Sequence, residues 1–95
     1  MIKEYQINLN EAVGLYQEYI EEQTKLRKRF KELGRLDFHR LYSEDKMSEE
    51  DFNKLDEEFT FVRGFIVMNR LVINGLSNHI KDLKKKIKTY QRNNH

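Results

Sequence analysis

Apolar side chains recur at alternating intervals of three and four residues through the second half of the chain. This spacing constrains the fold more than any other feature. Eleven of the twelve positions in the series are apolar, and Asn69 is the exception. A period of about 3.5 residues marks a helical face that another helix has to cover, with a left-handed twist between the two. We call the series the C-terminal seam: Phe52, Leu55, Phe59, Val62, Ile66, Asn69, Ile73, Leu76, Ile80, Leu83, Ile87 and Tyr90.

The sequence around this seam also predicts the ends of its helix. Ser48 is a good N-cap, and the acidic residues after it suit the positive end of a helix dipole. The heptad phase passes through Gly64 and Gly75 without a shift. We therefore expect one very long C-terminal helix over about 48–92, with a break at Asn74-Gly75 as the alternative.

The first half of the chain carries a weaker copy of the pattern, which we call the N-terminal seam. It predicts a helix over about 3–33 with Gly34 as its C-cap. The alternative is an extended arm followed by a helix that starts at Asn8. Residues 34–47 then form a connector, part of which is expected to make a short helical turn. The N-terminal seam consists of Ile2, Tyr5, Leu9, Ala12, Tyr16, Tyr19, Gln23, Leu26, Phe30 and Leu33.

Charge predicts how the two helices meet. Residues 25–31 hold five cations and no acid, whereas residues 48–58 hold six acids and one lysine. An antiparallel hairpin that turns near residue 41 places these stretches side by side, and the set of opposite charges favours that orientation. The expected fold is therefore all-α, a single helical domain over 1–95. In this register the last fifteen residues overhang the first helix.

A second apolar stripe on the long helix does not fit a lone hairpin. A partner helix covers one face only, and an exposed stripe of large side chains marks an interface. We expect two hairpins to pair antiparallel through it into a homodimeric four-helix bundle or coiled coil. The alternatives are closure by residues 34–47 into a three-helix monomer, or a heterologous partner. Gly64 and Gly75 lie near the ends of the stripe, where a missing side chain lets a partner helix approach closely; the alternative is that both are tolerated without a role. Its residues are Phe61, Phe65, Met68 and Val72.

Asn69 is the polar member of the C-terminal seam. A buried amide at such a position is satisfied by a polar neighbour such as a tyrosine hydroxyl, or it fixes the register of the helices at some cost in stability. Contact with an outside ligand is the third interpretation.

Residues suited to catalysis or cofactor binding are scarce. The chain has no cysteine, and its four glycines stand alone. This excludes thiolate chemistry and glycine-rich phosphate loops. Only His79 has a carboxylate at helical spacing, Asp82, and two ligands are too few for a metal site; His39 is expected in the connector and His95 at a frayed end. We expect no enzyme activity, no catalytic residue, no metal and no cofactor.

The end of the chain is strongly basic, although the net charge of the whole chain is only +2. We expect this basic segment to bind a protein partner. Nucleic acid is the alternative ligand, and a solvated cationic helix end is the plain interpretation. Its cations are Lys81, Lys84, Lys85, Lys86, Lys88 and Arg92.

Two further absences bear on location. No run of eighteen uncharged apolar residues occurs, so we expect no membrane span. The first residues also lack the basic and apolar pattern of a signal peptide. The expected location is cytoplasmic.

The composition resembles that of proteins from low-GC Gram-positive bacteria and their phages, since Lys, Ile, Asn, Glu and Tyr abound and alanine occurs only at Ala12. In size and helical layout the chain resembles the small accessory proteins of staphylococcal-type phages and phage-related pathogenicity islands. That resemblance implies a regulator that binds and inhibits one host or phage regulatory or assembly protein. The alternatives are a nucleic-acid-binding transcriptional regulator and a structural or scaffolding component. No residue role is carried over.

Overall fold

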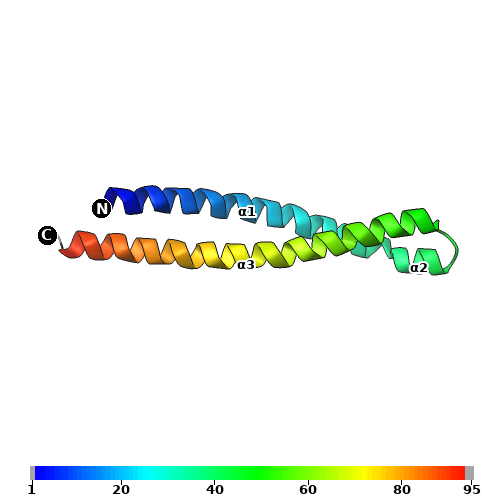
Figure 1. Ribbon diagram of the computed structural model, residues 1–95. Coiled ribbons are helices and arrows are strands. Elements are labelled where there is room, and N and C mark those ends of the chain that lie inside the picture. The colour runs from blue at the N-terminus through cyan, green and yellow to red at the C-terminus, as the bar shows by residue number, and fades with distance from the viewer. Residues whose placement is uncertain (1, 94–95) are drawn as a thin grey trace. The chain divides into compact units, whose positions relative to one another are not determined.

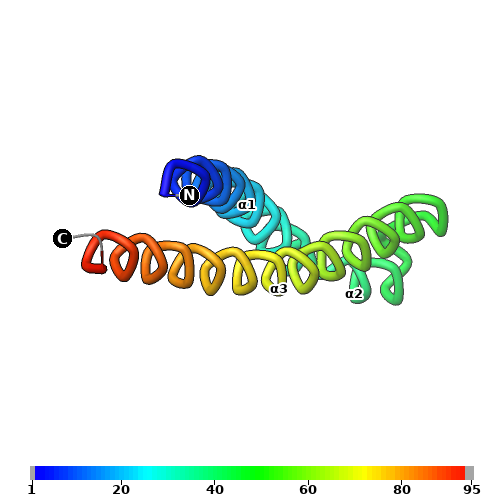
Figure 2. The backbone as a smooth tube through the Cα atoms, turned by 60° about the vertical axis from the view of Figure 1, so that its left-hand side comes forward, coloured from blue at the N-terminus to red at the C-terminus, as the bar shows by residue number. Residues whose placement is uncertain are grey.

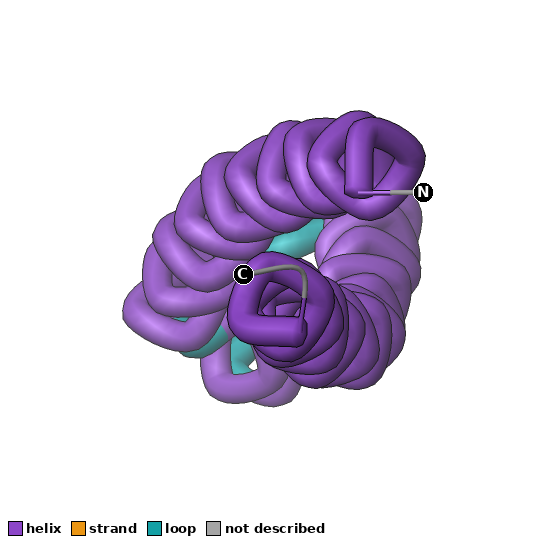
Figure 3. Tube along the Cα trace, turned by 90° about the vertical axis from the view of Figure 1, so that its left-hand side faces the viewer, coloured by secondary structure: helices purple, strands orange, loops and turns teal. Residues whose placement is uncertain are grey.

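The computed structural model describes residues 2–93 and places most of them in three helices: α1 (Ile2–Leu36), α2 (Phe38–Ser43) and α3 (Glu49–Asn93) (Figure 1). Within these residues the loops are confined to the connections between the helices (Figure 3). No strand occurs among them. The predicted all-α class and the helical-hairpin layout are confirmed.

The chain forms two compact units, and both long helices contribute to each. Residues 22–69 make the first, which we call the turn unit because it contains α2 and the connections on either side of it. Residues 1–21 and 70–95 make the second, the terminal unit.

The core of the turn unit is built from the two seams, as predicted. Every seam residue in this unit is buried or half-buried, and Leu33 is 0% exposed. The rings of Phe30 and Phe59 stack at 4.9 Å between centroids. The ring centroid of Phe38 in α2 lies 5.8 Å from that of Phe52 and 5.9 Å from that of Phe59. The short helix α2 therefore packs beside the first turns of α3 (Figure 2).

The terminal unit follows the same rule. Ala12 of α1 and Leu83 of α3 are buried, and the other seam residues described in this unit are half-buried, except Tyr90. Heptad spacing therefore identified the packed face of both long helices in both units.

The hairpin turns later than predicted. Gln23 pairs with Ile66, and Phe30 with Phe59, which places the turn between the end of α2 and the start of α3 rather than near residue 41. The reason is α2, which continues along α3 after α1 has ended and so postpones the reversal of the chain.

The predicted overhang of the last fifteen residues is wrong for the same reason. In the terminal unit Tyr5 lines one hollow together with Lys85, Lys86 and Asn93. The first turns of α1 therefore lie beside the last turns of α3.

The N-terminal helix begins as predicted near Lys3 but ends later than predicted. It begins at Ile2, so the alternative of an extended arm before Asn8 is wrong. It also runs past Gly34, which is helical, and ends at Leu36. Asp37 terminates it in the left-handed conformation, with φ 48° and ψ 50°. Aspartate tolerates that conformation better than most residues, because its short polar side chain can form local hydrogen bonds.

The predicted start of the long helix is confirmed. The backbone N–H of Asp51 donates to Ser48 Oγ at 3.1 Å, which satisfies one of the free amides of the first turn. The helix then continues without interruption to Asn93. The alternative break at Asn74-Gly75 is therefore wrong.

Candidate interaction surfaces

A face of α3 beside the seam, which we call the outer face, is apolar and exposed in the turn unit. Phe61 is 59%, Phe65 45% and Met68 60% exposed, whereas Val62 and Asn69, on the seam side, are buried. This part of α3 therefore lacks a cover on its outer face within the described chain.

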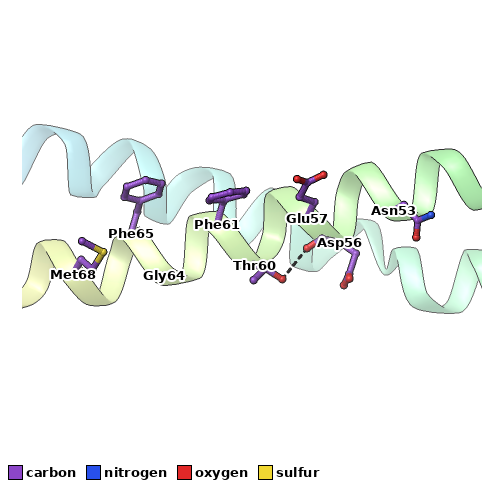
Figure 4. Close-up of a pocket in the computed structure, with 8 residues that line it drawn as sticks. All are labelled: Asn53, Asp56, Glu57, Thr60, Phe61, Gly64, Phe65 and Met68. Atoms are coloured by element: carbon purple, nitrogen blue, oxygen red, sulfur yellow. Dashed lines mark hydrogen bonds between the residues drawn. The ribbon is translucent and has the colours of Figure 1, made fainter.

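Two rows of residues shape this outer face into a shallow groove (Figure 4). In each row the side chains recur every fourth residue, the arrangement into which the ridge of a second helix packs. The rings of Phe61 and Phe65 lie nearly parallel, with centroids 6.3 Å apart, and form one wall. Thr60 Oγ1 donates to the carbonyl oxygen of Asp56 at 2.9 Å, so its hydroxyl is already satisfied. One row is Asn53, Glu57, Phe61 and Phe65, and the other is Asp56, Thr60, Gly64 and Met68.

Gly64 lowers the floor of the groove. A β-carbon added there would meet no atom within 4 Å. Glycine inside a helix costs about 0.5–1 kcal/mol relative to alanine. No contact within the described chain explains why glycine rather than alanine occupies this position.

The four residues predicted for self-association are all exposed, but they divide between the units. Phe61, Phe65 and Met68 line the groove of the turn unit. Val72 belongs to the terminal unit, where its neighbour Leu71 is also exposed.

The connector does not close this groove. The ring of Phe38 in α2 packs on seam residues, and Tyr42 stacks on Phe52 with centroids 4.4 Å apart. Both contacts belong to the seam side of α3. The alternative of a three-helix closure by residues 34–47 over Phe61 and Phe65 is therefore wrong.

The polar members of the two seams occupy one layer of the turn unit. Gln23 is 5% and Asn69 6% exposed. Gln23 Nε2 donates to the carbonyl oxygen of Ile66 at 2.9 Å, a contact that the sequence did not predict. Gln23 Oε1 and Asn69 Nδ2 are buried without a hydrogen-bond partner among residues 2–93. The expectation that a tyrosine hydroxyl satisfies Asn69 Nδ2 is wrong.

One ion pair joins the oppositely charged stretches of α1 and α3. Arg29 forms a two-pronged pair with Glu58, through Nε to Oε1 and through Nη2 to Oε2 at 2.9 Å. These hydrogen bonds hold the pKa of the Glu58 carboxyl below its usual value and raise the pKa of Arg29. The pair lies on the flank of the turn unit and leaves the groove residues uninvolved.

The predicted basic segment lies in the terminal unit, and all six of its cations are exposed. Among residues 2–93 none of its six cations forms an ion pair with a carboxylate. Lys85 and Lys86 share one hollow with the rings of Tyr5 and Tyr90. A second hollow includes Lys81 and Lys84 beside other residues of both helices.

No group of three or more His, Cys, Asp or Glu side chains in the described range is placed to hold a metal ion. His39 Nε2 lies 3.8 Å from Asp56 Oδ1 on the surface of the turn unit. His95 lies outside the described residues.

By length and composition, α3 also meets the criterion for a membrane span. Its most apolar stretch of eighteen residues has a mean hydropathy of 1.2 and is 17% buried. A single helix of this kind is weak evidence for a span, because the core helices of soluble proteins pass the same test.

No protein-family model, curated protein or solved structure matches this chain. The residues and their arrangement therefore carry the functional argument.

Proposed function

We propose that the protein is a non-enzymatic interaction module. In this proposal a helical hairpin dimerises through the outer face of α3, and the dimer binds and inhibits a regulatory or assembly protein. The observation that carries the proposal is the exposed apolar groove around Phe61, Phe65 and Met68.

The groove supports self-association through its apolar area. Full burial of a large apolar side chain is worth about 1.5–3 kcal/mol relative to exposure. Phe61, Phe65 and Met68 are each roughly half exposed, so a cover over all three gains several kcal/mol. Exposed apolar patches of this kind mark interaction sites in soluble proteins.

The basic segment supports a second contact, with an acidic surface of a protein partner. Within residues 2–93 its six cations form no ion pair with a carboxylate. A surface of one charge sign accelerates the encounter with a surface of opposite charge and selects against other partners.

Light scattering on wild type and on Phe65→Glu tests self-association. We expect wild type to have twice the mass of one chain at tens of micromolar protein and Phe65→Glu to be a monomer. Leu15→Glu is the matched control, since Leu15 is 47% exposed on α1, close to the 45% of Phe65. A monomeric wild type would refute dimerisation, and equal effects of both substitutions would refute the assignment to the groove.

The partner contact is tested by neutralising Lys84, Lys85 and Lys86 together with glutamine. A pull-down from a low-GC Gram-positive host should lose its specific partner with this variant. The control is the same replacement at Lys25, Lys28 and Lys31 in the turn unit, which should retain the partner. Loss with both variants would show that overall charge, rather than the basic segment, determines binding.

Nucleic-acid binding is the second candidate function, because Tyr5 and Tyr90 line a hollow with Lys85 and Lys86. Aromatic rings beside cations are the combination on which single-stranded nucleic acids stack. If this function holds, affinity for a single strand should fall with salt. The slope of log K against log salt should then decrease by about 0.7 for each phosphate contact that the neutralised variant loses. No binding at low salt would exclude it.

A further inference from the structure

We propose that the cover of the outer face of α3 is the same helix of a second copy, which lies antiparallel to it with the two-fold axis at Met68. This inference rests on the proposed dimerisation and adds the register. In an antiparallel two-fold pair, each residue faces the residue that lies equally far on the other side of the axis. Met68 is the one residue that faces its own copy.

Residue size is complementary in this register. Phe61 of one copy faces Gly75 of the second, and Val72 of the second copy faces Gly64 of the first. A β-carbon at Gly64 or Gly75 would meet nothing within 4 Å in the described part of its own chain. Each glycine is therefore free to accept a large side chain from outside, and its lack of a side chain lets the two helices approach. Self-pairing thus gives a reason for both glycines.

Charge is complementary as well. Glu50 faces Lys86 of the second copy, Lys54 faces Asp82, and Glu57 faces His79. All six of these residues are exposed. Lys54 Nζ lies 3.3 Å from Glu50 Oε1 in its own helix, so the pair can extend into a network across the interface. Exposed pairs contribute little affinity, but they select orientation and register.

Other arrangements lose these matches. A parallel pair brings Glu50 and Lys86 each against its own copy. An antiparallel axis at Phe65 sets Phe61 opposite the buried seam residue Asn69. An axis at Leu71 brings Gly64 against Asn78, so that an amide rather than an apolar side chain fills the groove.

Cysteine cross-linking reports the register directly, because the chain has no cysteine of its own. Packed helix axes lie about 8–10 Å apart, and Cα atoms lie about 2.3 Å from their axis. Facing Cα atoms therefore lie about 3.4–5.4 Å apart, a range that overlaps the Cα separation of about 4.4–6.8 Å that a disulfide needs. Met68→Cys should form a disulfide-linked dimer at least about tenfold faster than Phe65→Cys or Leu71→Cys, whose sulfur atoms face other residues. Phe61→Cys should cross-link slowly alone and rapidly when mixed with Gly75→Cys.

The outcomes separate this inference from the proposed function. Faster cross-linking at Phe65→Cys or Leu71→Cys, with a dimeric mass, would overturn the register and leave dimerisation standing. A dimeric mass in which no α3 cysteine cross-links faster than the exposed α1 control Asn10→Cys would overturn pairing through α3. A monomeric mass for wild type would overturn both.

Charge reversal gives an independent readout of the same register. Lys54→Glu and Asp82→Lys should each weaken the dimer about 2- to 30-fold, since each change removes two symmetry-related pairs of modest strength. The double variant should restore most of the affinity. Additive loss in the double variant would contradict the pairing of Lys54 with Asp82.

Discussion

Replacing Asn69 with leucine should stabilise the hairpin. Asn69 is 6% exposed, and its Nδ2 has no hydrogen-bond partner in the described part of the chain. A buried unpaired amide costs about 1–3 kcal/mol, and leucine has the same branched shape without the polar atoms. Leucine also suits the apolar layers formed by the neighbouring seam residues. We expect the free energy of unfolding to rise by about 1–3 kcal/mol, and each 1 kcal/mol raises Tm by about 4–8 °C in a chain of this size.

Two control variants isolate the cause. Asn10 is exposed on α1, so Asn10→Leu measures the gain in helix propensity, a few tenths of a kcal/mol. Gln23→Leu should gain less than Asn69→Leu, because it also removes the hydrogen bond to Ile66. Urea unfolding at one fixed protein concentration gives all three values. A destabilised Asn69→Leu variant would show that the amide has a stabilising partner and would refute this reasoning.

Three further predictions concern the hairpin itself. Leu33→Ala should destabilise it by about 2–5 kcal/mol, because Leu33 is 0% exposed; Leu15→Ala, at an exposed site, should cost far less in the same urea titration. Gly34→Ala should raise Tm, since Gly34 is helical and a β-carbon there meets nothing within 4 Å. A lower Tm would indicate instead that Gly34 acts as the C-cap of α1. Arg29 holds the pKa of Glu58 below its ordinary value near 4.5, so the stability contributed by this ionisation is complete above that value. It is lost as the pH falls through the lower pKa of the folded state. Glu58→Gln should therefore flatten the acid limb of a plot of stability against pH, and an unchanged limb would contradict the pairing.

The packed faces were predictable because a heptad period leaves few choices for which side of a long helix is covered. Leu33 and Val62 are buried where the seams place them. The N-cap at Ser48 was equally predictable, since capping depends on local chemistry.

The register was not predictable from the same pattern. A heptad seam remains apolar when its partner helix slides by one repeat. The predicted turn near residue 41 also treated residues 34–47 as a simple connector, whereas α2 continues the hairpin along α3. With the turn near residue 41, Gln23 falls opposite Phe59. The observed turn places Gln23 beside Ile66, and only the structure shows the hydrogen bond from Gln23 to the Ile66 carbonyl oxygen.

The end of α1 was missed because glycine is the usual left-handed residue after a helix, and Asp37 takes that role here. In the candidate site, the outer stripe on α3 was predicted and its exposure agrees with the prediction. The acidic groove residues Asp56 and Glu57 were missed, because they had been assigned only to the pairing of α1 with α3.

Solvent access to the Met68 methyl group tests the central claim most directly. Met68 is 60% exposed in the single chain, whereas Met47 is half-buried and serves as an internal reference. Methyl NMR with a soluble paramagnetic probe should show that Met68 becomes protected as the protein concentration rises, while the signal of Met47 changes little. An equally accessible Met68 at every concentration would contradict the claim that another helix covers the outer face of α3.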